Sequence, residues 1–224
     1  CSLITTACIS SKRCRRRFIR ESKPAQNQLF LMTQPLLLRA LLALCLACGA
    51  LTACTQPPPP FRSVALEGVN WGGDFELTAH TGERLRSADY RGKLLVLFFG
   101  YTHCPDVCAP TLVKLAQLSS ALGEEAKRIQ VLFISVDPQH DSPAQLKKFL
   151  AGFDPAFIGL TGTADELGAA AADHMVFFKQ ARAGRIEHTS MLFVKDTKGR
   201  VRLLIKESAP FDDMQHDLRL LLAE

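Results

Sequence analysis

The chain has 224 residues, and its 27 lysines and arginines against 22 aspartates and glutamates give it a net charge of +5. Residues 1–53 hold eight of the basic residues and one acidic residue, so the chain from Cys54 onward has a net charge of −2. The basic character therefore belongs to residues 1–53, here called the leader, and gives no reason to expect a nucleic-acid partner. Six of the eight cysteines lie at or before Cys54, which leaves Cys104 and Cys108 for the rest of the chain and excludes a disulfide-rich scaffold.

Residues 32–53 have the pattern of a secretory signal peptide. Arg39 precedes an apolar run, 40–53, that is short for a bilayer span and ends in small residues. The run leads into LTAC, residues 51–54, which resembles the bacterial lipobox, where the cysteine becomes lipid-modified and forms the new N-terminus. A plain signal anchor followed by a chance cysteine is the alternative. We expect lipidation at Cys54.

The position of the signal peptide also sets the expected boundaries of the other segments of the chain. Because residue 1 is a cysteine, Met32 is the expected start, and residues 1–31 are expected to be translated upstream sequence. Residues 54–61 include four consecutive prolines and are expected to form a lipid-anchored, stiff linker. Residues 62–224 are long enough for one domain with its own hydrophobic core.

Within this domain, apolar runs alternate with helical patterns. The expected elements are, in chain order, a hairpin within 75–90, a buried strand at 94–99, a helix from Pro110 to Gly123, a buried strand at 129–136, a helix over 142–150, a helix over 163–172, a hairpin joining 188–194 to 201–205, and a helix at 212–222. Ser142 before Pro143 and Thr163 with Glu166 are helix-start signals. This order predicts an α/β domain whose central mixed sheet is flanked by helices on both faces, with an N-terminal hairpin.

The two cysteines directly follow the first predicted parallel strand, in GYTHCPDVCAPTL, residues 100–112. In open α/β sheets, binding sites lie beyond the carboxyl ends of parallel strands. Residues i and i+4 on a helical turn share a face, so both sulfurs can converge on one ion, and a nearby helix start favours thiolates. Thiolate pairs prefer copper(I), and an imidazole would complete a three-coordinate site that also accepts copper(II). A structural zinc site would want a fourth strong ligand, and an idle disulfide is the bland alternative.

Residue chemistry alone does not show which of the six histidines would supply the imidazole ligand. The six histidines are His80, His103, His140, His174, His188 and His216. We expect His80 and His216 to be exposed, His174 to end a helix as a cation, and His103 to point away from a site shared with Cys108. His140 follows Asp137 at a strand end and is a minor contender.

Three nearby acidic residues are not expected to be ligands. Asp106 is expected to cap the helix, with charge tuning near the thiols as its alternative role. Asp137, before Pro138, is expected to form a turn. Glu187 should face the opposite side of its strand from His188.

Four segments occur in an order and at spacings similar to those of the Sco/SenC family: GYTHCPDVCAPTL, SVDPQHDSP, LTGT and EHTSMLFVKDTKGR. The chain from residue 61 to residue 224 resembles this family of thioredoxin-fold, copper-binding proteins, which help to assemble the copper centre of respiratory cytochrome oxidase. The resemblance implies a thioredoxin-like fold, copper(I) and copper(II) as bound ions, and Cys104, Cys108 and His188 as metal ligands. The sequence departs from the family at Ala109, where proline is usual, and in a short loop over 179–187, which affects the rim of the site.

Two functions are therefore considered. The first is a copper metallochaperone, with an accessory thiol–disulfide reductase activity at most, that serves the copper-receiving subunit of cytochrome c oxidase. A periplasmic copper donor and a membrane, held through the lipid anchor at the periplasmic face of the bacterial inner membrane, would be its other partners. The alternative is a periplasmic thiol–disulfide oxidoreductase or thiol peroxidase that uses Cys104 and Cys108. The CxxxC spacing, and His188-Thr189 where thioredoxins have a proline, favour the first.

Overall fold

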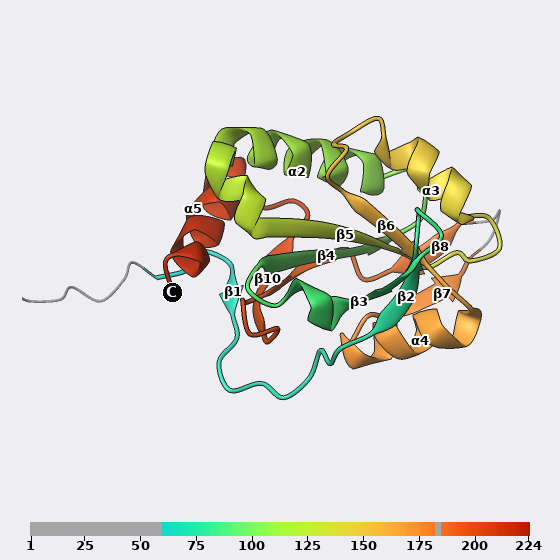
Figure 1. The fold of residues 1–224 in the computed structure, drawn as a ribbon, viewed down its shortest axis with the longest axis horizontal. Coiled ribbons are helices and arrows are strands. Elements are labelled where there is room, and N and C mark those ends of the chain that lie inside the picture. The colour runs from blue at the N-terminus through green and yellow to red at the C-terminus, as the bar shows by residue number, and fades with distance from the viewer. Residues whose placement is uncertain (1–59, 182–184) are drawn as a thin grey trace, which may run out of the picture. The chain divides into compact units, whose positions relative to one another are not determined.

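The computed structural model describes residues 60–181 and 185–224 (Figure 1). The predicted signal peptide, the lipidation site at Cys54 and nearly all of the linker lie outside the described residues. Within the described ranges, no helix combines the length and the apolar character needed to cross a membrane.

Most of the strands form one mixed sheet. Its members are β1 (Val64–Ala65), β2 (Glu76–Ala79), β3 (Arg84–Arg86), β4 (Leu94–Gly100), β5 (Ile129–Ser135), β6 (Ile158–Thr161), β9 (Met191–Lys195) and β10 (Val201–Lys206). They lie in the order β1-β10-β9-β4-β5-β6-β2-β3. The neighbours β4, β5 and β6 are parallel, whereas β9 pairs with β4, and β2 with β6, in antiparallel fashion. The predicted mixed sheet and its N-terminal hairpin, β2–β3, are confirmed.

Helices cover both faces of the sheet. They are α2 (Cys108–Leu122), α3 (Pro143–Leu150), α4 (Ala164–Asp173) and α5 (Phe211–Leu222), with short 3₁₀ turns η1 (Ser87–Tyr90) and η2 (Gly123–Arg128). Leucines and a methionine of α2, α3 and α5 share one hydrophobic cluster, and α4 contributes to a second. Figure 1 shows α2 and α3 on the opposite side of the sheet from α4.

The central strand β4 supplies side chains to both clusters. All of its residues are buried, with Leu94, Val96 and Phe98 in the cluster with α2 and Leu95, Leu97 and Phe99 in the cluster with α4. Burial of each such side chain contributes about 1.5–3 kcal/mol to folding. The continuous apolar run was the right signal for a strand buried on two faces. The core therefore fixes the carboxyl end of β4, where the cysteine loop begins.

The helix boundaries follow the local sequence signals closely. The Ser142 hydroxyl accepts a hydrogen bond from the Gln145 N–H, and Thr163 and Glu166 form a complete capping box. Helix α2 ends at Leu122, and the C-cap residue Gly123 has a φ of 56°, which favours glycine. It begins at Cys108, two residues before the predicted start. Pro110 therefore lies in the first turn, where its missing N–H costs no hydrogen bond.

The predicted strand over 188–194 is divided in two. Strand β8 (Ile186–His188) ends before β9 begins at Met191, and it pairs with β7 (Phe178–Gln180) in a separate ribbon rather than with the main sheet. Thr189 continues the ribbon, because its N–H donates to the Phe177 carbonyl. The hairpin of β9 and β10 is otherwise as predicted. His188 thus belongs to a two-stranded ribbon beside the sheet.

Candidate metal centre

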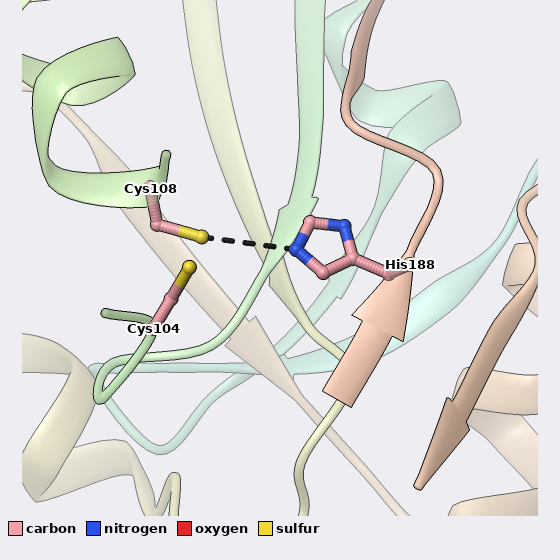
Figure 2. A group of neighbouring side chains, drawn as sticks. All are labelled: Cys104, Cys108 and His188. Carbon is pink, nitrogen blue, oxygen red and sulfur yellow. Dashed lines mark hydrogen bonds between the residues drawn. The ribbon is translucent and has the colours of Figure 1, made fainter. Parts of the chain in front are cut away.

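Three side chains converge beyond the carboxyl end of β4. Sulfur atoms of Cys104 and Cys108 and a ring nitrogen of His188 all lie within 4.8 Å of one another. Cys108 Sγ lies 3.9 Å from His188 Nε2. Figure 2 shows the two sulfurs facing the imidazole edge, with Cys108 on α2 and His188 at the end of β8. Residues 80 positions apart therefore form one potential ligand set.

The loop between β4 and α2, rather than a helical turn, brings the sulfurs together. Cys104 lies before the helix, so the expectation that both cysteines share a helical face is wrong. The chain instead bends around the start of α2, where the nearby backbone N–H groups of Asp106, Val107 and Cys108 lower the pKa of Cys104. The orphan N–H groups of a helix start stabilise a nearby anion, here the thiolate.

The two thiols differ in acidity. Burial alone would raise the pKa of Cys104, but hydrogen bonds from the surrounding backbone N–H groups and from the Cys108 thiol outweigh it, and its pKa is lowered. Burial raises the pKa of Cys108 far above its ordinary value. In the metal-free protein, Cys104 is thus the more easily ionised sulfur, and a bound metal ion would favour loss of the Cys108 proton.

His188 is held in an orientation suited to a metal ligand. Burial lowers its pKa, which favours the neutral imidazole. Nδ1 lies 3.2 Å from the Thr189 carbonyl oxygen, and since a carbonyl can only accept, the ring hydrogen is on Nδ1. Nε2 therefore presents its lone pair to the sulfurs. A backbone carbonyl that fixes the second nitrogen is the usual support of a metal-bound histidine.

Tyr101, which the sequence interpretation did not single out, supports the ribbon that carries His188. Its hydroxyl oxygen accepts a hydrogen bond from the Ile186 N–H at 3.2 Å, and its ring meets the His188 ring edge-on at 5.9 Å between centroids. Tyr101 is also buried. It thereby connects the cysteine loop to β8.

Gly100 is a second residue that sequence reasoning missed. A Cβ at this position would lie 2.8 Å from Cys108 Sγ and 2.8 Å from a ring carbon of Phe133, closer than real Cβ contacts. Only glycine lets the buried sulfur pack against the strand end. The available signal was a glycine that interrupts the apolar run immediately before the cysteine loop.

The remaining candidates have other roles. The prediction that Asp106 caps α2 is wrong, because no side chain caps this helix start and the Asp106 carboxylate instead pairs with Arg185 at 2.6 Å. Glu187 is exposed, and the alternation of side chains along β8 puts it on the opposite side from the half-buried His188, as predicted. His103, with His140, contacts Asp137 instead of the thiols, so its predicted direction is confirmed and His140 is no ligand of this centre.

Three histidines lie elsewhere. His174 is buried, which lowers its pKa to about 4, and its Nδ1 donates to the Ala170 carbonyl; the expected cation at a helix end is therefore a neutral ring. His80 and His216 are half-buried rather than exposed, and His80 accepts a hydrogen bond from the Gly159 N–H. Packing against neighbouring elements, which residue type does not reveal, accounts for these differences.

Comparison with known proteins decides the family. The sequence model of SCO1/SenC matches residues 64–223, which is most of the chain. The chain belongs to the SCO1/SenC family. Its thioredoxin-like fold is shared with solved members of this family, including Bradyrhizobium japonicum ScoI with copper bound, at 33% identity and a TM-score of 0.63 over 68% of this chain and 99% of that one.

Two further SCO1/SenC relatives extend the comparison. A SCO1/SenC family lipoprotein from Bacillus anthracis is 27% identical, with a TM-score of 0.63 over 70% of this chain and 97% of that one. A SCO2-like protein of Rickettsia felis is 31% identical over 156 residues, which are 66% of this chain and 76% of the relative. Against the family pattern, Ala109 simply occupies the first turn of α2, with Pro110 still in that turn.

Proposed function

We propose that this protein is a copper metallochaperone that binds copper through Cys104, Cys108 and His188 and assists assembly of the copper centre of cytochrome c oxidase. The observation that carries the proposal is the convergence of two thiols and one lone-pair nitrogen within 4.8 Å, in a family with a copper-bound solved member. Copper is here the cargo of the protein.

The donor set fits copper in both oxidation states. Two thiolates suit copper(I), and the imidazole nitrogen adds a ligand that copper(II) prefers. Cys104 is only half-buried, so one side of the site is open for the ion to enter and leave, whereas Cys108 is fully buried. No further cysteine lies among the described residues to complete a four-ligand structural zinc site.

The proposed partners follow from this role. The recipient would be the copper-receiving subunit of cytochrome c oxidase, and a periplasmic donor would load the site. Lipidation at Cys54 would hold the domain at the periplasmic face of the inner membrane. The lipoprotein relative from Bacillus anthracis supports such an anchor.

Copper stoichiometry and ligand assignment test the proposed function. The fully reduced chain, titrated anaerobically with copper(I), should bind about one more equivalent per chain than a Cys104→Ser/Cys108→Ser variant. X-ray absorption of the difference should show two sulfur neighbours, with a nitrogen neighbour in the copper(II) form. Because both proteins retain the leader cysteines, equal copper uptake by the two would place the copper elsewhere and contradict the proposal.

The anchor has its own test. Cys54→Ser should abolish incorporation of labelled lipid and cleavage by the lipoprotein signal peptidase, because the lipid is attached through the cysteine sulfur. Cys48→Ser, six residues earlier in the same apolar run, is the matched control and should be processed normally. Unchanged lipid labelling in Cys54→Ser would show that LTAC is not a lipobox here.

Thiol–disulfide exchange is a second candidate, favoured by the contrast between the two thiols. Cys104 has the lowered pKa of an attacking thiolate, and the buried Cys108 could act as the resolving thiol. In such a reaction Cys104 would attack a substrate disulfide and release one thiol, and Cys108 would then displace the second, leaving the pair oxidised. His188 has no necessary part in these steps, and this difference separates the two functions.

A further inference from the structure

A second group of ligand-type side chains lies near the first. His103 in the loop after β4, Asp137 directly after β5 and His140 in the turn before α3 bring two ring nitrogens and a carboxylate oxygen within 4.8 Å of one another. Asp137 Oδ2 lies 2.8 Å from His140 Nδ1 and 3.3 Å from His103 Nε2. The carboxyl ends of two adjacent parallel strands thus each contribute to this group.

Asp137 is the fixed member of the group. Its side chain is 2% exposed, and its backbone N–H donates to the Ser135 hydroxyl while its carbonyl accepts from the Asp141 N–H. The second carboxylate oxygen, Oδ1, is buried and has no hydrogen-bond partner in the part of the chain that the structure describes. Burying a carboxylate in this way is costly unless a cation offsets its charge.

The two imidazoles form the open side of the group. The side chains of His103 and His140 are 44% and 65% exposed, and their rings meet edge-on at 5.2 Å between centroids. Both rings can therefore adjust without disturbing the core. The exposed imidazole nitrogens beside the buried carboxylate are accessible to a hydrated ion.

We propose that His103, Asp137 and His140 form a second metal site, which takes one divalent ion of the zinc(II) and copper(II) class. Two nitrogens and one oxygen are the donors that these borderline ions prefer, whereas copper(I) prefers the thiolates. Metal–ligand bonds of about 2.0–2.2 Å place tetrahedral ligand atoms about 3.4 Å apart. The 3.3 Å between His103 Nε2 and Asp137 Oδ2 already matches this spacing. A small rotation of the exposed His140 ring would lengthen its 2.8 Å separation from Asp137 Oδ2 to the same spacing.

Proton balance is simple at such a site. In the metal-free state His140 Nδ1 donates to the carboxylate, since a carboxylate can only accept, and His103 Nε2 lies 3.3 Å from the same oxygen. On binding, a neutral ring carries its single hydrogen on the other nitrogen with no net release, and a protonated ring loses one proton to solvent; in either case the freed lone pair binds the ion. A water molecule would fill the fourth position. No electron transfer is involved.

The second site is chemically separate from the thiol centre. The Tyr101 ring lies against both imidazole groups, 4.8 Å from the His103 ring and 5.9 Å from the His188 ring between centroids. His103 and Cys104 are nevertheless consecutive residues of one loop. The proposal stands whether or not the thiol centre carries copper, because none of its ligands belongs to that centre.

The test uses the full chain with the thiol centre removed. In a Cys104→Ser/Cys108→Ser background, zinc titrated by calorimetry should occupy one site that His140→Asn weakens at least about 100-fold. His216→Asn, on α5, is the matched control and should leave zinc binding unchanged. The leader cysteines are common to all of these variants, so they cancel in the comparison.

A spectroscopic readout makes the result independent of any loss of stability. Zinc should shift the imidazole nitrogen NMR signals of His103 and His140, and copper(II) should give an electron paramagnetic resonance signal with two nitrogen couplings that His140→Asn reduces to one. Identical zinc affinity with and without His140→Asn, or unshifted ring signals, would overturn the proposal and leave the group as an ion pair only.

Discussion

Replacing His188 with alanine is expected to remove tight copper(II) binding from the Cys104–Cys108–His188 centre. The site would keep both thiolates but lose its one nitrogen, which copper(II) requires more than copper(I) does. We expect copper(II) affinity to fall at least about 100-fold, together with the thiolate-to-copper absorption, while copper(I) still binds the sulfur pair. Oxidase assembly in a cell that depends on this variant should fail. Optical titration with copper(II) and oxidase activity in membranes measure the two effects.

The same variant separates the two candidate functions. The ribbon should remain in place, because the Ile186 N–H still donates to Tyr101. If thiol exchange were the physiological activity, the variant would reduce disulfides and support oxidase assembly nearly as well as the parent. His216→Ala is the control for loss of a half-buried histidine. Wild-type copper(II) spectra and normal oxidase activity in His188→Ala would exclude His188 as a ligand and remove most of the case for copper.

Oxidation of the cysteine pair is expected to have an equally large effect. Joining Cys104 to Cys108 converts both soft ligands into a disulfide, which offers no thiolate to the metal. Copper(I) bound at this centre should fall from about one equivalent per chain to about none. Competition against a chromophoric copper(I) chelator, before and after oxidation, measures the change.

Two controls are needed for this measurement. Reduction of the oxidised sample should restore binding, which shows that the fold survived. The Cys104→Ser/Cys108→Ser variant, reduced and oxidised in the same way, gives the copper(I) bound by the leader cysteines under each condition, and this amount is subtracted from the wild-type value. Equal copper(I) binding by oxidised and reduced wild-type protein would mean that the pair is not the binding site.

The sequence predicted those parts of the fold that depend on residues close to one another along the chain. Long apolar runs and helix-start patterns located β4, β5, α3 and α4 nearly to the residue, because burial on both faces and side-chain capping are local in origin. Short strands were missed, including β6 and the exposed β7, because three or four residues carry no readable periodicity. The interruption after His188 was missed for the same reason.

At the site, the cysteines could be predicted and their surroundings could not. Their position after a buried strand was sufficient to expect chemistry there. His188 was selected only through the family resemblance, since its approach to Cys108 depends on a ribbon that Tyr101 supports. Asp137 indicated no more than a turn. Its burial against two histidines results from the parallel packing of β4 and β5, which no local pattern encodes.

The 80-residue separation between Cys108 and His188 has a consequence for stability. An ion held by both would act as a reversible cross-link between α2 and the β7–β8 ribbon, closing a long loop that the unfolded chain leaves open. Because only the folded chain gathers these ligands, bound copper would stabilise it, by about 2.7 kcal/mol at a free concentration one hundred times the dissociation constant. Release of the ion would remove this stabilisation and leave the metal-free protein easier to unfold.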